Sequence, residues 1–461
     1  MMNGLLALPQ WRSYFGQPSA TILGTMNAMY PVGKMIGLLL VTFLSDRFGR
    51  RFPLRIGLPL LLFAAALQGS AQNVGWFIAS RFLVGFGTSF IAQPSPILIT
   101  ELAYPLYRGR ITGVYYSSNY LGTLIAAWVT YGTFRMNSNW SWRIPSILQA
   151  TIPLIQLVGI WWIPESPRWL IAKGKHEQAR KILEKHHAGG DQTSALVDFE
   201  MREIEASIRL EAQTLSETSY LDLIRTLPNL RRTFISMVVG VYAYWAGVGV
   251  ITYYLTLVLN TIGITAVSTQ TLLNALIAVM NFFTAVGSGL LVDRAGRRFL
   301  FMLSVSGMLI AFTTWTILSA RFSLSQDKGL GKAVLGFIFI FSFFFQIAFS
   351  PLLIAYPIEI WPFTLRARGL TVSLFSTYSG LLIGLFVTPI GLRNIGWKYY
   401  IVFCVLLALL WLIVYFVFPE TRGRTLEEIN NVFETPVQDH DLELKHVPTV
   451  QQLDRVESKT T

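Results

Sequence analysis

The sequence contains few charged residues and a single cysteine. Of 461 residues only 13% are charged and 53% are hydrophobic, whereas a soluble domain has about 25% charged residues. The one cysteine, Cys404, excludes a disulfide framework and a cysteine metal site. No G-x-x-x-x-G-K stretch is present to cradle the phosphates of ATP. Nothing in the sequence resembles a catalytic triad or a metal cluster, so we expect neither an enzyme nor a cofactor.

Long apolar stretches are abundant instead. The mean hydropathy is +0.50, and stretches of about 20 apolar residues, the length of a helix that crosses a bilayer, recur along the chain. The sequence therefore predicts an all-α membrane protein that crosses the lipid bilayer many times. We expect eleven spans, near 19–44, 56–72, 75–98, 111–133, 144–163, 233–257, 270–292, 299–320, 332–356, 370–392 and 399–418.

The basic residues indicate how these spans are oriented. Most of the 37 lysines and arginines lie in alternate loops, in the segment 164–232 and in the tail. Since lysine and arginine accumulate on the cytoplasmic side, we expect these parts inside and the N-terminus outside. The net charge of +12 is thus a topology signal, and we expect no nucleic-acid partner. Within 164–232, residues 175–187 and 198–213 are predicted to be short surface helices, with His186 and His187 on a solvated face.

Three charged phrases occur twice, in the same order in each half. The pairs are Ser45–Arg51 with Val292–Arg298, Glu101–Gly109 with Glu359–Gly369, and Pro164–Arg168 with Pro419–Gly423. Such a pattern indicates an internal duplication. The first half has five predicted spans and the second has six, so we expect one helix to be missing before Met1. The predicted domains are an N-terminal bundle 1–163, a cytoplasmic connector 164–232, a C-terminal bundle 233–418 and a cytoplasmic tail 419–461, disordered beyond residue 433.

The repeated phrases supply carboxylates and guanidiniums at cytoplasmic helix ends. Arginine binds carboxylate through two parallel hydrogen bonds, so these groups can tie the helix ends of the two halves together. Such ties can break and form again, which suits a gate. The alternative interpretation is that these charges only mark the cytoplasmic side of the membrane. Exposed ion pairs would then contribute little to stability.

These phrases, with Arg81–Gly87, PESPRWL and PETRGRTLEEI, resemble the sugar porter family of the major facilitator superfamily over about residues 19–433. The resemblance is greatest to fungal lactose-permease-like and hexose transporters. It implies two six-helix bundles that alternate access to a central sugar site, here with eleven helices because the first is missing. It also implies a cytoplasmic gate made by Asp46, Arg47, Arg50, Arg81, Glu101, Arg108, Glu165, Arg168, Asp293, Arg294, Arg297, Glu359, Arg366 and Glu420.

A neutral polyol requires uncharged polar side chains and aromatic faces near the middle of the bilayer. The candidates are Asn119, Asn274, Asn281 and Thr388, although a membrane asparagine can equally join helices. The glycine-rich stretch 242–254 and Ser350-Pro351 can open or bend their helices.

In the family that the chain resembles, the stretch 242–254 carries a glutamine where this sequence has Tyr244. The pair Tyr253-Tyr254 resembles the outer lid of the family. We therefore expect Tyr244 to stack on a sugar ring while Asn281 hydrogen-bonds its hydroxyls, with Tyr253 and Tyr254 completing the site.

Lys34 lies in the middle of a predicted span, where a charge costs about 2.5–3.5 kcal/mol on insertion scales. The spans contain no deep carboxylate to pair with it. Its partner is either an acid on a missing helix or water in a cavity.

We expect a monomeric secondary transporter in the plasma membrane that moves a hexose or a disaccharide such as lactose. Proton coupling is expected only for a longer form of the chain. The alternatives are a sugar sensor, a carrier of a polyol or another small solute such as a quinate-like acid, and an inactive truncated fragment.

Overall fold

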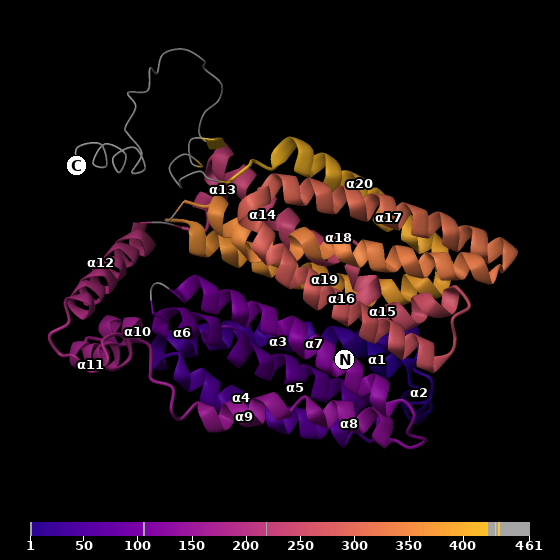
Figure 1. The fold of residues 1–461 in the computed structure, drawn as a ribbon, viewed down its shortest axis with the longest axis horizontal. Coiled ribbons are helices and arrows are strands. Elements are labelled where there is room, and N and C mark those ends of the chain that lie inside the picture. Colours follow the sequence, from indigo (N-terminus) through magenta and orange to yellow (C-terminus); the bar gives the residue numbers. More distant parts are fainter. Residues whose placement is uncertain are drawn as a thin grey trace, which may run out of the picture.

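The computed structural model describes residues 2–104, 107–217, 219–362 and 364–422, together with residues 429, 432 and 433. Within these residues the regular structure is helical throughout. Figure 1 shows two bundles of long helices lying one above the other, with short helices at one end. The predicted all-α fold is confirmed.

The first bundle, called the N-half below, is built from residues 20–159. Its helices are α3 Ala20–Phe48, α4 Arg51–Gly69, α5 Val74–Ala92, α6 Pro94–Leu102, α7 Arg108–Thr133, α8 Trp140–Leu148 and α9 Thr151–Gly159. Two predicted spans are each divided into two helices. The break between α5 and α6 falls at Pro94, which occupies the first helical position, where its missing N–H costs nothing.

The second bundle, the C-half, is built from residues 227–417. Its helices are α14 Leu227–Trp245, α15 Val248–Thr261, α16 Val267–Ala295, α17 Arg297–Ser325, α18 Lys328–Ile360, α19 Arg366–Ile395 and α20 Tyr399–Val417, with a short 3₁₀ turn at Gly396–Lys398. The glycine-rich stretch interrupts the helix, as the sequence predicts. Gly247 separates α14 from α15 with φ +99°, a conformation that residues other than glycine rarely adopt.

Four helices connect the halves: α10 Pro167–Ala172, α11 His176–His187, α12 Ala195–Glu217 and α13 Asp222–Arg225. Helices α11 and α12 confirm the two predicted surface helices. They lie at the left-hand end of the bundles in Figure 1, which we call the connector end. By the charge distribution, this end is the predicted cytoplasmic side. The predicted tail 419–461 falls mostly outside the described residues.

Residues before the first predicted span also form helices, α1 Met2–Ala7 and α2 Pro9–Tyr14. Helix α1 packs against α15 and α16 of the C-half and against α7 of the N-half. Leu5, Leu8 and Trp11 are fully buried. The sequence predicts no span here, because this segment is too short to cross a membrane.

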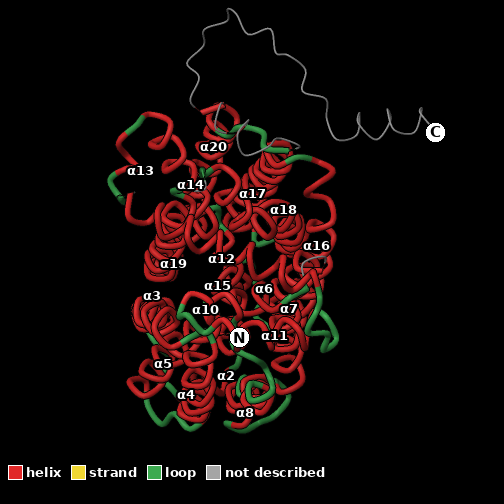
Figure 2. Tube along the Cα trace, turned by 90° about the vertical axis from the view of Figure 1, so that its left-hand side faces the viewer, coloured by secondary structure: helices red, strands yellow, loops and turns green. Residues whose placement is uncertain are grey.

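The halves meet along two helix pairs. In Figure 2, which views the connector end, α19 lies directly above α3 on one side and α16 lies above α7 on the other, and both pairs are in contact. Small residues allow close approach: a Cβ at Gly24 would lie 3.4 Å from the carbonyl oxygen of Leu385. Ala127 packs against Ala275 and Ala278 in the second pair.

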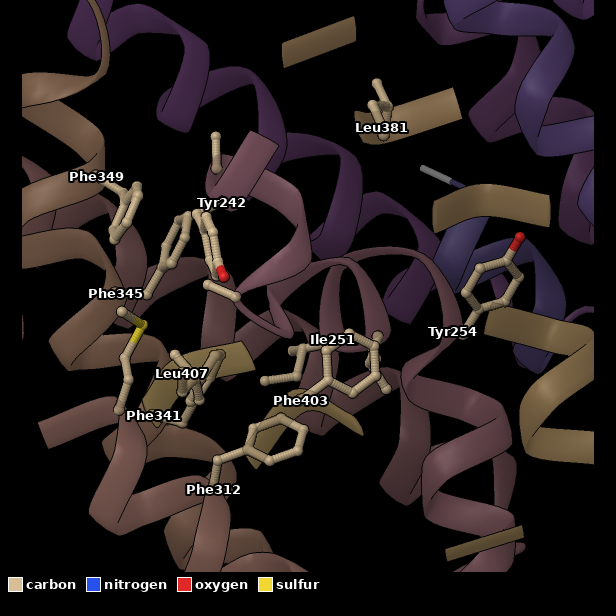
Figure 3. Close-up of a cluster of buried hydrophobic side chains, with 14 of the residues drawn as sticks. Tyr242, Ile251, Tyr254, Phe312, Phe341, Phe345, Phe349, Leu381, Phe403 and Leu407 are labelled. Atoms are coloured by element: carbon tan, nitrogen blue, oxygen red, sulfur yellow. The ribbon is translucent and has the colours of Figure 1, made fainter. Parts of the chain in front are cut away.

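The core of the C-half is rich in aromatic side chains. Figure 3 shows part of this buried cluster, with Phe312, Phe341 and Phe403 gathered beside Leu407. The Phe312 and Phe341 ring centroids are 5.3 Å apart at 68°, an edge-to-face arrangement that aromatic pairs favour. This packing joins α17, α18 and α20 in the core of the C-half.

Eight helical stretches in the described part of the chain are long and apolar enough to cross a membrane, and the last of these, Arg368–Val417, includes both α19 and α20. A multi-pass membrane protein is therefore confirmed, while the count of eleven spans stays a prediction.

Candidate functional site

A central cavity of about 680 Å³ lies between the halves. This volume falls in the range of about 300–1,000 Å³ that is typical of small-molecule sites. Side chains from both halves line it, including residues of α3, α5 and α7 on one side and of α14 to α16, α18 and α19 on the other.

Uncharged amides project from several helices into this wall. Asn119 comes from α7, Asn274 and Asn281 from α16 and Gln346 from α18. The Oδ1 atom of Asn281 is buried and has no hydrogen-bond partner. Because a buried acceptor without a partner costs about 1–3 kcal/mol, this atom is suited to accept a hydrogen bond from a hydroxyl of a solute.

Aromatic side chains form much of the remaining wall. Tyr30 and Tyr378 line it from α3 and α19, and Tyr244 and Tyr253 line it from either side of the break at Gly247. The break lets the end of α14 and the middle of α15 both face the cavity. The structure thus brings Asn119, Tyr244, Tyr253 and Asn281 of the predicted substrate residues together in one wall.

Two predicted substrate residues lie elsewhere. Tyr254 is fully buried and does not line the cavity; its hydroxyl donates to the carbonyl oxygen of Leu385 at 2.6 Å and accepts from the Asn27 amide at 3.2 Å. Thr388 is also buried, with its hydroxyl 3.4 Å from that of Tyr399. It borders a narrow crevice behind Tyr244.

Arg81, predicted in the cytoplasmic gate, lines the cavity instead. Its guanidinium carbon lies 5.2 Å from the Tyr30 ring centroid, and its Nε donates to the carbonyl oxygen of Met26 at 3.4 Å. The reason is its depth: α5 begins at Val74, at the end away from the connector. Lys34 also lines the cavity, with its Nζ 5.2 Å from the Tyr378 ring centroid.

At the connector end, the first and third repeated phrases meet in the same way in each half. Glu165 accepts from the backbone N–H groups of Arg50 at 2.9 Å and Arg51 at 3.2 Å. Its counterpart Glu420 accepts from the backbone N–H groups of Arg297 at 2.8 Å and Arg298 at 3.1 Å.

Glu420 also accepts from the backbone N–H groups of Thr421 and Arg422, both at 3.0 Å. Burial alone would raise the pKa of the Glu420 carboxyl. The four N–H donors stabilise its charged form and hold the pKa below its ordinary value.

Glycine is required in both turns for two reasons. Gly49 and Gly296 have φ +96° and +93°, and a Cβ would lie 2.5 Å from Oε2 of Glu165 in one turn and 2.8 Å from Oε2 of Glu420 in the other. The sequence D-R-x-G-R-R therefore folds into a turn that holds a carboxylate.

The second phrase contributes a carboxylate to the arginine of each turn. Arg50 Nε lies 3.4 Å from Glu101 Oε2, and Arg297 binds both oxygens of Glu359 from Nε at 3.2 Å. Each of these ion pairs joins residues of one half. The interpretation as ties between the halves therefore finds no support in these two pairs.

The other predicted gate residues are spread over the connector end. Asp46 is 3.3 Å from Arg50 with 72% of its side chain exposed, Arg47 is exposed beside Phe43 and Phe48, and Arg168 donates to Ser207 of α12 at 3.1 Å. Arg294 is exposed and Arg366 is half-buried. The side chains of Arg108 and Asp293 lie outside the described residues.

The prediction of a solvated face is wrong for His187. Its side chain is 4% exposed; Nδ1 lies 2.7 Å from Glu200 Oε2, and Nε2 lies 3.2 Å from the carbonyl oxygen of Leu102. It is buried because α11 packs between α12 and the end of α6, whereas His186 is exposed.

Several cavity residues were not identified from the sequence, among them Tyr30, Tyr120, Gln346 and Tyr378. Gln346 offered a signal, since it is a lone amide within a phenylalanine-rich run. The hydroxyl of Tyr120 lies 3.0 Å from Gln346 Oε1 and 2.7 Å from Ser350 Oγ, so it joins α7 to α18 across the interface. Nothing in the sequence distinguishes the three tyrosines from those in the packed core.

Comparisons with known proteins place this geometry among transporters. The chain matches the family described as "Sugar (and other) transporter" over residues 2–433. A "High-affinity glucose transporter" of Kluyveromyces lactis is 28% identical over 456 residues, covering 94% of this chain and 81% of that protein. The "MFS-type transporter oryC" of Aspergillus oryzae is 29% identical over 430 residues, covering 91% of this chain and 78% of that protein.

Solved structures are similar in fold. The xylose transporter XylE from E. coli in an inward open conformation gives a TM-score of 0.74 at 22% identity, covering 94% of this chain and 96% of that one. The same transporter, described as a proton:xylose symporter and bound to 6-bromo-6-deoxy-D-glucose, gives 0.71 at 23% identity, covering 94% and 97%. The chain therefore has the major facilitator fold.

Proposed function

The chain belongs to the sugar (and other) transporter family, and on this premise we propose that it is a secondary transporter that moves a sugar across a membrane by alternating access. The observation that carries the proposal is the central cavity of about 680 Å³, which both halves line with amides and tyrosines. A sugar presents hydroxyls on its rim and C–H groups on its faces, and these two kinds of side chain complement them.

The site would hold the sugar through residues on opposing helices. Asn281 would bind a hydroxyl through its unpartnered Oδ1, with Asn119 facing it from the N-half. Tyr244 would stack on the ring. Since stacking depends mainly on the apolar ring area, we expect Tyr244→Phe to have a mild effect on transport and Tyr244→Ala a severe one.

Alternating access would require the contacts between the halves to open and close at opposite ends. Away from the connector end, Tyr254 of α15 binds Asn27 of α3. In the middle, Tyr120 of α7 binds Gln346 and Ser350 of α18. The ion pairs of Arg50 and Arg297 each stay within one half. These contacts fit a state closed at the end away from the connector.

The repeated charged turns would then serve as rigid ends of each half that dock when the connector end closes. The residues proposed for this gate are those at the connector end, without Arg81. We further propose a monomer in the plasma membrane, with a cytoplasmic connector and tail. Movement down the gradient is proposed for this chain, since no carboxylate lies deep in its membrane helices to take up a proton.

Uptake by purified protein in liposomes tests the function. We expect saturable uptake of radiolabelled glucose or another sugar, and exchange against unlabelled sugar inside the vesicles. Asn281→Ala should raise the half-saturating concentration about tenfold, the effect of losing about 1.4 kcal/mol of binding free energy. Asn137→Ala, at an exposed residue between α7 and α8, is the matched control and should leave uptake unchanged. Absence of saturable uptake for every sugar and sugar derivative tested would exclude the proposal.

A further inference from the structure

Two cationic side chains from neighbouring helices face the central cavity. Lys34 of α3 and Arg81 of α5 both line it. Lys34 directly follows Gly33, and Arg81 lies about one helical turn before Gly85, and at these two glycines the helices approach each other closely. A Cβ at Gly33 would lie 2.9 Å from the backbone nitrogen of Phe86 in α5, and one at Gly85 would lie 2.8 Å from the carbonyl carbon of Tyr30 in α3. The crossing therefore brings both charges to one side of the cavity.

No carboxylate offsets these charges within the described cavity wall, which contains no aspartate or glutamate. The sequence of the membrane helices explains why. In helices α3 to α9 and α14 to α20, acidic residues occur only in the last turns, as Asp46, Glu101, Asp293 and Glu359. All four therefore lie at the connector end, and the pairs described above place Glu101 and Glu359 against arginines there.

The contacts that Lys34 and Arg81 do make leave their charge in place. Lys34 lies over the ring of Tyr378 at 5.2 Å, and Arg81 lies over the ring of Tyr30 at 5.2 Å. Arg81 donates a long hydrogen bond, 3.4 Å, to the carbonyl oxygen of Met26. An aromatic ring attracts a cation but carries no net charge. A cation within a membrane helix is costly, and such a residue marks a solute or ion pathway.

A neutral sugar would gain little from this pair of charges, whereas a carboxylate would gain charge-assisted hydrogen bonds from both. The wall opposite Lys34 and Arg81 still provides the amides that suit hydroxyls, Asn281 and Gln346 among them. We propose that the transported solute is a sugar acid, an aldonate or a uronate, whose carboxylate binds beside Lys34 and Arg81 while its hydroxyls face the amides. This inference rests on the proposed transport function and narrows its substrate class.

Uptake and competition assays in liposomes test the substrate class separately from the transport function. Purified 461-residue protein would be assayed for uptake of radiolabelled D-glucuronate, D-gluconate and D-glucose at one pH. We expect glucuronate or gluconate to have a half-saturating concentration at least about tenfold below that of glucose, and to inhibit glucose uptake. Saturable glucose uptake that neither acid inhibits would overturn the inference and leave the transport function intact. Uptake of none of the three would overturn the inference, and it would overturn the transport function as well if no other sugar is taken up.

Variants of Lys34 test the role of the charge. Lys34→Gln should reduce the uptake of the acids at least about tenfold at limiting concentration and reduce glucose uptake much less. Lys34→Arg, which keeps the charge, should restore preference for the acids. Lys332→Gln, at an exposed lysine near the start of α18, is the matched control. Equal effects of Lys34→Gln on acid and sugar uptake, in protein that elutes as a single peak on size exclusion, would contradict a carboxylate site at Lys34.

Discussion

Replacing Gly296 by alanine tests the reasoning about the repeated turns. Gly296 has φ +93° and ψ 148°, a region that is essentially confined to glycine, and another residue there costs about 1–3 kcal/mol. The new Cβ would also lie 2.8 Å from Oε2 of Glu420, so the carboxylate must move away from the Arg298 N–H that Oε2 accepts at 3.1 Å.

The expected loss follows from these two effects. A hydrogen bond to a charged group contributes about 1.5–3 kcal/mol, and partial solvent exposure of Glu420 places this case at the lower end. Together with the backbone strain, Gly296→Ala should destabilise the protein by about 3–4 kcal/mol. At about 2 °C per kcal/mol for a large chain, the melting temperature should fall by about 6–8 °C.

The assay is thermal unfolding of detergent-purified protein, followed by size-exclusion chromatography of the soluble fraction. Gly49→Ala should behave in the same way, because Gly49 holds the equivalent position beside Glu165. Gly289→Ala is the control: this helical glycine of α16 has open space around it, and alanine favours helix. A parent-like melting temperature for both Gly49→Ala and Gly296→Ala would refute the argument.

Three further predictions concern other parts of the structure. Glu420→Gln should destabilise the protein at neutral pH. Because folding lowers the pKa of Glu420, the stabilisation that its charge provides is complete above the ordinary pKa of 4.5 and is lost as the pH falls through the folded pKa. The melting temperatures of parent and variant should therefore converge in acid, and a difference that grows in acid would contradict the reasoning. His187→Phe should loosen α11 and α12 from the end of α6, because it removes the contacts with Glu200 and Leu102; hydrogen exchange in both helices should rise, and unchanged exchange would refute the coupling. Tyr254→Phe removes the hydrogen bonds to Asn27 and Leu385. The population of molecules open at the end away from the connector should rise about tenfold for each 1.4 kcal/mol lost, measured by thiol labelling from that side. Identical labelling of parent and variant would show that these hydrogen bonds do not hold that end closed.

Features that depend on local sequence were predictable. The duplicated phrases indicated turns at helix ends, and Gly49 and Gly296 lie in such turns. The glycine-rich stretch predicted the interruption that Gly247 provides. The connector helices were predictable because apolar residues recur every three or four positions in otherwise polar segments.

Features that depend on the rotation and depth of a helix were not predictable. Tyr253 and Tyr254 are neighbours, but only Tyr253 faces the cavity, and the backbone of Tyr254 departs from helical values with φ −133°. Arg81 belongs to a motif associated with the gate, yet its distance from the connector end along α5 puts it in the cavity wall. His187 is buried by a contact with Leu102, 85 residues away in sequence, which no local pattern encodes.

Protection of a cysteine in the cavity wall by substrate tests the central claim most directly. Thr123 of α7 lines the cavity and is exposed to it, and the only native thiol can be removed by Cys404→Ser. In that background, Thr123→Cys should react with a membrane-impermeant thiol reagent added from the connector side, and a saturating concentration of the solute that the liposomes take up should slow the reaction at least about tenfold. An unchanged rate of reaction in the presence of that solute would contradict a central transport site between the two halves.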